Sequence, residues 1–196
     1  MNDKKFDIII KRLKEDSRNK SYTERGIPPI FQVSPKAQIL IIGQAPGKKV
    51  EESFIPFNDK SGAKLVQWMG IDRDTFYSEK IAILPMDFYY PGKGKTGDLP
   101  PRSFIAKEYH KDILDLMPDI KLTILIGSYS MKYYLGKGMK ENLTETVRSY
   151  KKYLPKYFPI VHPSPLNFRW QKANPWFEGE VVPVLRDKVH KILADR

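Results

Sequence analysis

Apolar residues along the chain follow two alternating patterns. Short runs of mostly apolar residues are typical of strands buried on both faces of a parallel sheet, and they occupy residues 38–43, 81–84, 122–127 and 158–161. Longer segments repeat apolar residues at helical spacing, at 3–18, 61–70, 103–117, 128–135, 143–153 and 178–194. This alternation predicts an α/β fold, a three-layer α/β/α sandwich with a central, mostly parallel four-stranded sheet.

Single residues predict where several elements begin and end. Ser61 and Ser103 are placed to cap the helices that they open, and Gly70 is placed to end the first of them. Pro183 falls inside the last helical pattern, so that helix either starts later or bends there. No internal repeat or low-complexity linker interrupts the pattern, which predicts a single domain over residues 1–196.

Composition and charge narrow the functional classes. Lys and Arg outnumber Asp and Glu by 34 to 23, and the net charge of +11 favours a polyanionic partner, first of all DNA. No apolar run reaches the ~18 residues of a membrane span. The chain has no cysteine, which excludes disulfides, thiol nucleophiles and any cysteine-bound zinc or iron–sulfur cluster. We therefore expect a cytoplasmic monomer without metal, cofactor or membrane contact.

Each predicted strand runs into a loop that carries polar residues or tight turns. These loops are Gly43-Gln44-Ala45-Pro46-Gly47, Pro85-Met86-Asp87-Phe88, Gly127-Ser128-Tyr129 and His162-Pro163-Ser164-Pro165. The carboxyl ends of parallel strands share one edge, where open α/β sheets bind ligands, so the loops are expected to converge on one site. Gly43, Ala45 and Pro46 are predicted to form its floor around Gln44, although the stretch also suits an ordinary strand-to-loop turn.

The last of these loops carries a histidine at a strand end. There, His162 can donate a hydrogen bond to an oxygen that gains negative charge in a transition state, or it can tie down the loop. Further along, Ser164 can hold a phosphate, Leu166 can act as an apolar wedge between bases or pack into the core, and Arg169 supplies charge. With Asn167, these residues are predicted to contact DNA.

Three further residues are candidates for reading a base. In the long loop 44–60, Phe57 can stack on a planar base and Asn58 can read a base edge, or Phe57 is a lid packed on the core. Asp87 directly follows the second strand. It is a candidate for base recognition or for positioning water, and a turn-forming role suits it equally.

The Pro- and Gly-rich loop 85–102 is basic. Lys93, Lys95 and Arg102 resemble a phosphate-binding loop only superficially, because the segment lacks the nucleotide P-loop spacing and does not join a strand directly to a helix. We expect these three residues to contact the DNA backbone.

Taken together, these motifs resemble the uracil-DNA glycosylase superfamily over about residues 38–170. The segment 43–47 is similar to the superfamily's water-activating motif at the end of its first strand. Pro56-Phe57, with Ser61-Gly62 opening a helix, is similar to the Pro-Phe…Gly segment of its bacterial and archaeal iron–sulfur branch. The segment 162–167 matches the superfamily's second motif.

The resemblance implies an enzyme that flips a damaged base, uracil by default, and hydrolyses its bond to deoxyribose. Phe57 would stack on the flipped base, and His162 would stabilise negative charge on the carbonyl oxygen of the departing uracil. Ser164 would help to pinch the phosphate backbone, and Leu166 would enter the gap left by the base. Backbone amides near Gln44 would contact the base or a water molecule.

The chain departs from that family pattern in two places. Efficient members carry Asp or Glu in the first motif, where this chain has Gln44 and Ala45, and loss of a general base typically costs ~10²–10⁴ in rate. The Asn that other branches use to read uracil after the second strand has no clear match, and Asp87 lies nearest. Two alternatives therefore stay open: a module that binds DNA or a nucleobase without cleavage, and a hydrolase of a small nucleotide-like substrate.

Overall fold

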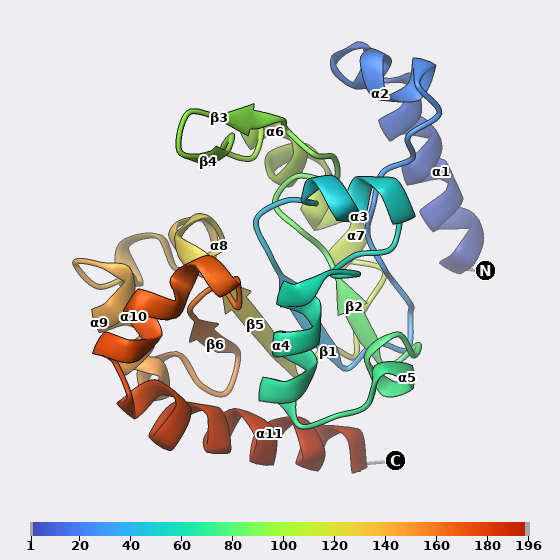
Figure 1. The fold of residues 1–196 in the computed structure, drawn as a ribbon. Helices are drawn as coiled ribbons and strands as arrows, with labels where there is room; N and C mark the ends of the chain where they lie inside the picture. Colours follow the sequence, from blue (N-terminus) through green and yellow to red (C-terminus); the bar gives the residue numbers. More distant parts are fainter. Residues whose placement is uncertain (1, 195–196) are drawn as a thin grey trace.

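The computed structural model describes residues 2–194, and a single four-stranded sheet forms its centre (Figure 1). Its strands are β1 (Ile39–Ile42), β2 (Ile81–Ile83), β5 (Leu122–Ile126) and β6 (Tyr157–Ile160). They lie in the order β2-β1-β5-β6, and all neighbours are parallel. Every residue of β1, β2 and β5 is buried, as the aliphatic runs predicted. The predicted sheet is confirmed.

Helices cover both faces of the sheet. The chain moves one way along the sheet from β1 to β2 and the other way from β2 to β5, so right-handed crossovers place the connecting helices on opposite faces. On one face, in front of the sheet in Figure 1, α4 (Lys60–Met69) packs against α11 (Val182–Ala194). The other face carries α1 (Asn2–Glu15), α6 (Ser103–Ile105), α7 (Lys111–Leu114) and α8 (Gly127–Leu135). This is the predicted three-layer sandwich.

Several short elements lie in the connections. They are α2 (Lys20–Glu24), α3 (Lys48–Ser53), α5 (Arg73–Phe76), α9 (Leu143–Arg148), α10 (Phe168–Ala173) and an antiparallel hairpin of β3 (Lys93–Gly94) and β4 (Gly97–Asp98). The two segments predicted as long loops are therefore interrupted, the first by α3 and the second by the hairpin. No helix within residues 2–194 is long and apolar enough to cross a membrane.

Both predicted serine caps are wrong. Asp59 caps α4, because its side chain accepts a hydrogen bond from the backbone N–H of Gly62, and Ser61 is buried inside the first turn. Ser103 is the first residue of α6 and makes no capping hydrogen bond. Gly70 ends α4 with a φ of 67°, as predicted. Pro183 is the second residue of α11, and a π-helical turn at Phe177–Val181 runs directly into that helix. The helical segment is therefore continuous ahead of the proline, and a wider π turn lies at this point.

Candidate active site

A cavity of about 540 Å³ opens at the carboxyl edge of the sheet. The chain leaves β1 toward α4 on one face and leaves β5 into α8 on the other, which is the split where open α/β sheets bind ligands. All four strand-end loops reach this cavity, as predicted from their positions. Its lining includes Gly43, Gln44, Ala45, Pro46, Phe57, Asp59, Ser61, Pro85, Asp98, Tyr129, His162, Ser164, Leu166 and Asn167.

His162 is presented to the cavity as a neutral hydrogen-bond donor. Its Nδ1 accepts a hydrogen bond from the backbone N–H of Ser164 at 3.1 Å, so the ring proton resides on Nε2. Nε2 has no hydrogen-bond partner among residues 2–194. Burial lowers the pKa of His162, and the charge of Asp59 only partly offsets that effect. At neutral pH the imidazole therefore offers an N–H to a ligand without carrying a charge.

The loop after His162 is fixed by its own hydrogen bonds. The Ser164 hydroxyl accepts from the N–H of Leu166 at 3.2 Å, and Asn167 donates its side-chain amide to the carbonyl oxygen of His162 at 2.8 Å. The Ser164 hydroxyl proton remains free to donate. Leu166 is 86% exposed at the tip of the loop, so it does not pack into the core, and Arg169 is exposed beyond it.

Phe57 lies in a strained backbone conformation against the first motif. Its φ of 57° is in the left-handed region, which residues other than glycine rarely adopt. A Cβ added at Gly43 would meet the Phe57 ring at 3.2 Å, and one at Gly62 would meet the Phe57 carbonyl oxygen at 1.7 Å. The ring also contacts Phe76 edge-on, with centroids 6.4 Å apart. Phe57 thus both packs against its neighbours, as a lid would, and lines the cavity.

The first motif supplies an amide and backbone groups but no carboxylate. Gln44 is half-buried in the cavity lining, and its side chain makes no hydrogen bond within residues 2–194. The carbonyl oxygens of Gly43 and Gln44 accept from the N–H groups of Met86 and Asp87, at 2.9 and 3.1 Å. These bonds hold the turn against the end of β2.

Asp87 points away from the cavity, which contradicts its predicted role in base recognition or water positioning. The side chain is fully buried, and its two carboxylate oxygens accept from Arg102 Nε, Nη2 and backbone N at 2.8–3.0 Å. It also accepts from the N–H of Tyr89 at 3.1 Å. At the end of β2, Pro85 forms the cavity wall instead. Asp87 therefore holds the loop 85–102 in place and does not line the cavity.

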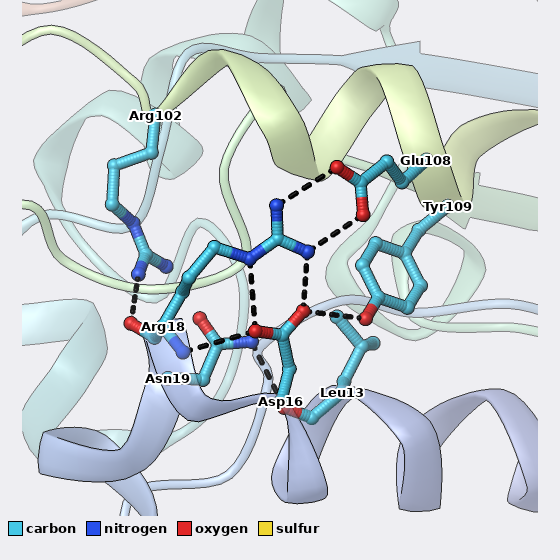
Figure 2. Close-up of polar contacts among 7 residues, drawn as sticks. All are labelled: Leu13, Asp16, Arg18, Asn19, Arg102, Glu108 and Tyr109. Carbon is cyan, nitrogen blue, oxygen red and sulfur yellow. Dashed lines mark hydrogen bonds and ion pairs between the residues drawn. The ribbon is translucent and has the colours of Figure 1, made fainter.

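Arg102 is half-buried, and its guanidinium is bonded within the protein, so its contact with the DNA backbone stays a prediction. Besides Asp87, it donates to the carbonyl oxygen of Arg18 at 3.1 Å (Figure 2). Figure 2 shows Arg18 itself bridging Asp16 and Glu108. Hydrogen bonds from Arg18 hold the pKa of Asp16 well below its ordinary value. Through Arg18, the segment after α1 is therefore bonded both to Arg102 and to Glu108.

Three more predicted residues, Asn58, Lys93 and Lys95, lie outside the cavity lining. The Oδ1 atom of Asn58 accepts from Arg73 Nη2 at 2.7 Å. The reading of a base edge by Asn58 stays a prediction. Lys93 and Lys95 are exposed on the hairpin, whose Thr96-Gly97-Asp98 tip lines the cavity. Their predicted contact with a DNA backbone fits this position.

Two carboxylates of the cavity were missed from the sequence. Asp59 and Asp98 both line it, beside Tyr129 of the predicted third loop. Asp59 has a side chain that suits a helix cap, but Ser61, two residues later, has one too, so the sequence does not choose between them. Asp98 belongs to a two-residue strand that carries no periodic signal.

The sequence of this chain matches known proteins. A sequence profile described as "Uracil DNA glycosylase superfamily" matches residues 30–186. The chain belongs to the uracil-DNA glycosylase superfamily. A Type-4 uracil-DNA glycosylase of Sulfurisphaera tokodaii is 29% identical over 143 residues, and the match covers 66% of this chain and 61% of that relative. A solution NMR structure of a candidate uracil DNA glycosylase from Methanosarcina acetivorans is 14% identical with a TM-score of 0.48, covering 82% of this chain and 98% of that one. The resemblance found from the motifs is confirmed at the level of the family.

Proposed function

We propose that this protein is a DNA-repair N-glycosylase that hydrolyses the bond between deoxyribose and a flipped, damaged base, with uracil as the default substrate. The observation that carries the proposal is His162, whose free Nε2–H lies in the cavity and whose imidazole is neutral. Membership of the superfamily and the net charge of +11 support a DNA substrate. The protein would act as a cytoplasmic monomer without metal or cofactor.

His162 would act on the leaving group. As the C1′–N bond breaks, its electron pair moves onto the base, and a base carbonyl oxygen gains negative charge. A preorganised N–H donor in a water-poor cavity stabilises that charge, and removal of one such donor typically costs ~10²–10³ in rate. A neutral imidazole suits this task, because it keeps its proton while the oxygen becomes a strong acceptor.

The remaining lining would bind the extruded nucleotide. The Phe57 ring, held against Gly43, would stack on the base above the turn that contains Gln44, Ala45 and Pro46. Exposed Leu166 has the size and position to fill the gap in the base stack.

Backbone contacts would come from both sides of the cavity mouth. Ser164 has a free hydroxyl proton, and Asn167 and Arg169 follow it in the same loop. Lys93 and Lys95 lie on the facing hairpin and would neutralise phosphates.

A second candidate is a protein that binds DNA or a nucleobase on the same site without cleavage. The absence of a carboxylate from Gln44 and Ala45 favours it. It predicts salt-dependent DNA binding with no abasic product under any condition, which separates it from the glycosylase in the same assay.

Cleavage of defined oligonucleotides tests the proposal. Single- and double-stranded oligonucleotides containing uracil, hypoxanthine or xanthine are incubated with wild type, His162→Ala and His190→Ala, and abasic sites are cleaved by alkali and resolved on a gel. His190 lies on α11, outside the cavity lining. We expect cleavage by wild type and His190→Ala, and ~10²–10³-fold slower cleavage by His162→Ala. Equal rates for His162→Ala and wild type would place the chemistry elsewhere.

A further inference from the structure

The cavity contains carboxylates, although the first motif does not. Asp59 and Asp98 both line it. Asp98 is exposed at the end of the hairpin, where Oδ1 accepts from the Tyr90 hydroxyl at 3.2 Å. Asp59 is half-buried at the start of α4, on the segment that carries Phe57. Of the two, Asp59 is therefore the less exposed to solvent.

The Asp59 carboxylate is held by one oxygen only. Its Oδ1 accepts from the N–H of Gly62 at 2.9 Å, which fixes the side chain at the helix terminus. Its Oδ2 makes no hydrogen bond within residues 2–194. The charge of Asp59 acts on the imidazole of His162, where it opposes the effect of burial on the pKa. Asp59, with one carboxylate oxygen unbonded, and His162, with a free Nε2–H, thus line the same cavity.

We propose that Asp59 supplies the catalytic carboxylate that Gln44 lacks, orienting and deprotonating the attacking water. The assignment rests on the proposed glycosylase function. As the C1′–N bond breaks with its electron pair on the base, the water oxygen bonds to C1′ and passes a proton to Asp59. That proton then leaves with the released base, and the sugar keeps the new hydroxyl. Gln44, with an amide that accepts and donates, orients the same water.

Asp59→Asn separates this chemistry from the capping role. Asparagine caps helices as well as aspartate does, so the variant keeps the hydrogen bond to Gly62 and loses only the proton acceptor. We expect single-turnover cleavage to fall ~10²–10⁴-fold. The melting temperature, and binding to an uncleavable oligonucleotide with 2′-fluoro-deoxyuridine, should stay unchanged. Asp72→Asn is the matched control: Asp72 caps α5 in the same way, at 2.6 Å from the Thr75 nitrogen, outside the cavity, and its variant should cleave normally.

A rescue variant completes the test. Gln44→Glu in the Asp59→Asn background returns a carboxylate to the cavity, and we expect it to recover at least ~10-fold of the lost rate. Asp59→Asn cleaving at the wild-type rate, or Asp98→Asn losing the activity instead, would overturn the assignment and leave the glycosylase proposal standing. Absence of cleavage by wild type on every oligonucleotide would overturn both together.

Discussion

His110 gives the protein a pH-dependent stability that can be measured without any substrate. The side chain is almost fully buried, with Nε2 2.9 Å from the carbonyl oxygen of Pro85 and Nδ1 2.6 Å from the hydroxyl of Tyr134. The Pro85 carbonyl only accepts, so Nε2 carries the proton and Nδ1 accepts from Tyr134. Burial lowers the pKa of His110 from 6.5 to about 4, against the Pro85 hydrogen bond, which raises it.

The sign and size of the effect follow from that pKa. As the pH falls below 6.5, His110 in the unfolded chain binds a proton, whereas in the folded chain it stays neutral until about pH 4. The contribution of neutral His110 to the free energy of unfolding is therefore complete above pH 6.5 and is lost as the pH falls toward 4. At ~1.36 kcal/mol per pKa unit, the loss is about 2 kcal/mol at pH 5 and about 3 kcal/mol below pH 4.

Urea denaturation at pH 7 and pH 5 measures this loss. Other groups also titrate in this range, so the informative quantity is the pH-dependent change in wild type minus that in His110→Gln. We expect wild type to lose about 2 kcal/mol more than the variant between the two pH values. His190→Gln, which removes a histidine that lies on the surface, should behave like wild type. An equal loss in wild type and His110→Gln would refute the reasoning.

Three further predictions address the supports of the site. Asp87→Asn leaves the guanidinium beside it without its buried counter-charge and should lower the free energy of unfolding by about 3–5 kcal/mol in urea titrations. Gly62→Ala puts a methyl group 1.7 Å from a carbonyl oxygen; we expect about 1–3 kcal/mol lower stability and slower cleavage, measured by thermal melts and the gel assay. The double variant Lys93→Ala, Lys95→Ala removes two expected phosphate contacts. In anisotropy titrations, the slope of log K against log salt concentration should become smaller in magnitude by about 2, whereas an unchanged slope would exclude phosphate contacts by these lysines.

The sheet was predictable because its strands are short, mostly apolar runs, which are typical of a parallel sheet covered on both faces. The residue that caps α4 was not predictable, because Asp59 and Ser61 both have side chains that cap helices and lie two positions apart. The local sequence allows α4 to begin after either residue. In the structure it begins after Asp59, and Gly62 then packs closely on Phe57. Helices such as α3 and α5 are four to six residues long and too short to show a helical period.

The site was predictable where a residue sits directly at a strand end. Gln44 and His162 reach the cavity because parallel strands end at one edge. Asp87 lies further past its strand, and its direction is decided by Arg102, fifteen residues later, which the sequence pattern does not reveal. The direction of the Asn58 side chain likewise depends on a partner fifteen residues away, Arg73.

The central claim is that His162 drives cleavage of a base from DNA, and the most direct test is the single-turnover rate of abasic-site formation on a uracil oligonucleotide. The account predicts product with wild type and a rate ~10²–10³-fold lower with His162→Ala, while both proteins bind the uncleavable oligonucleotide equally. Product formed at the same rate by both proteins, or by neither, would contradict it.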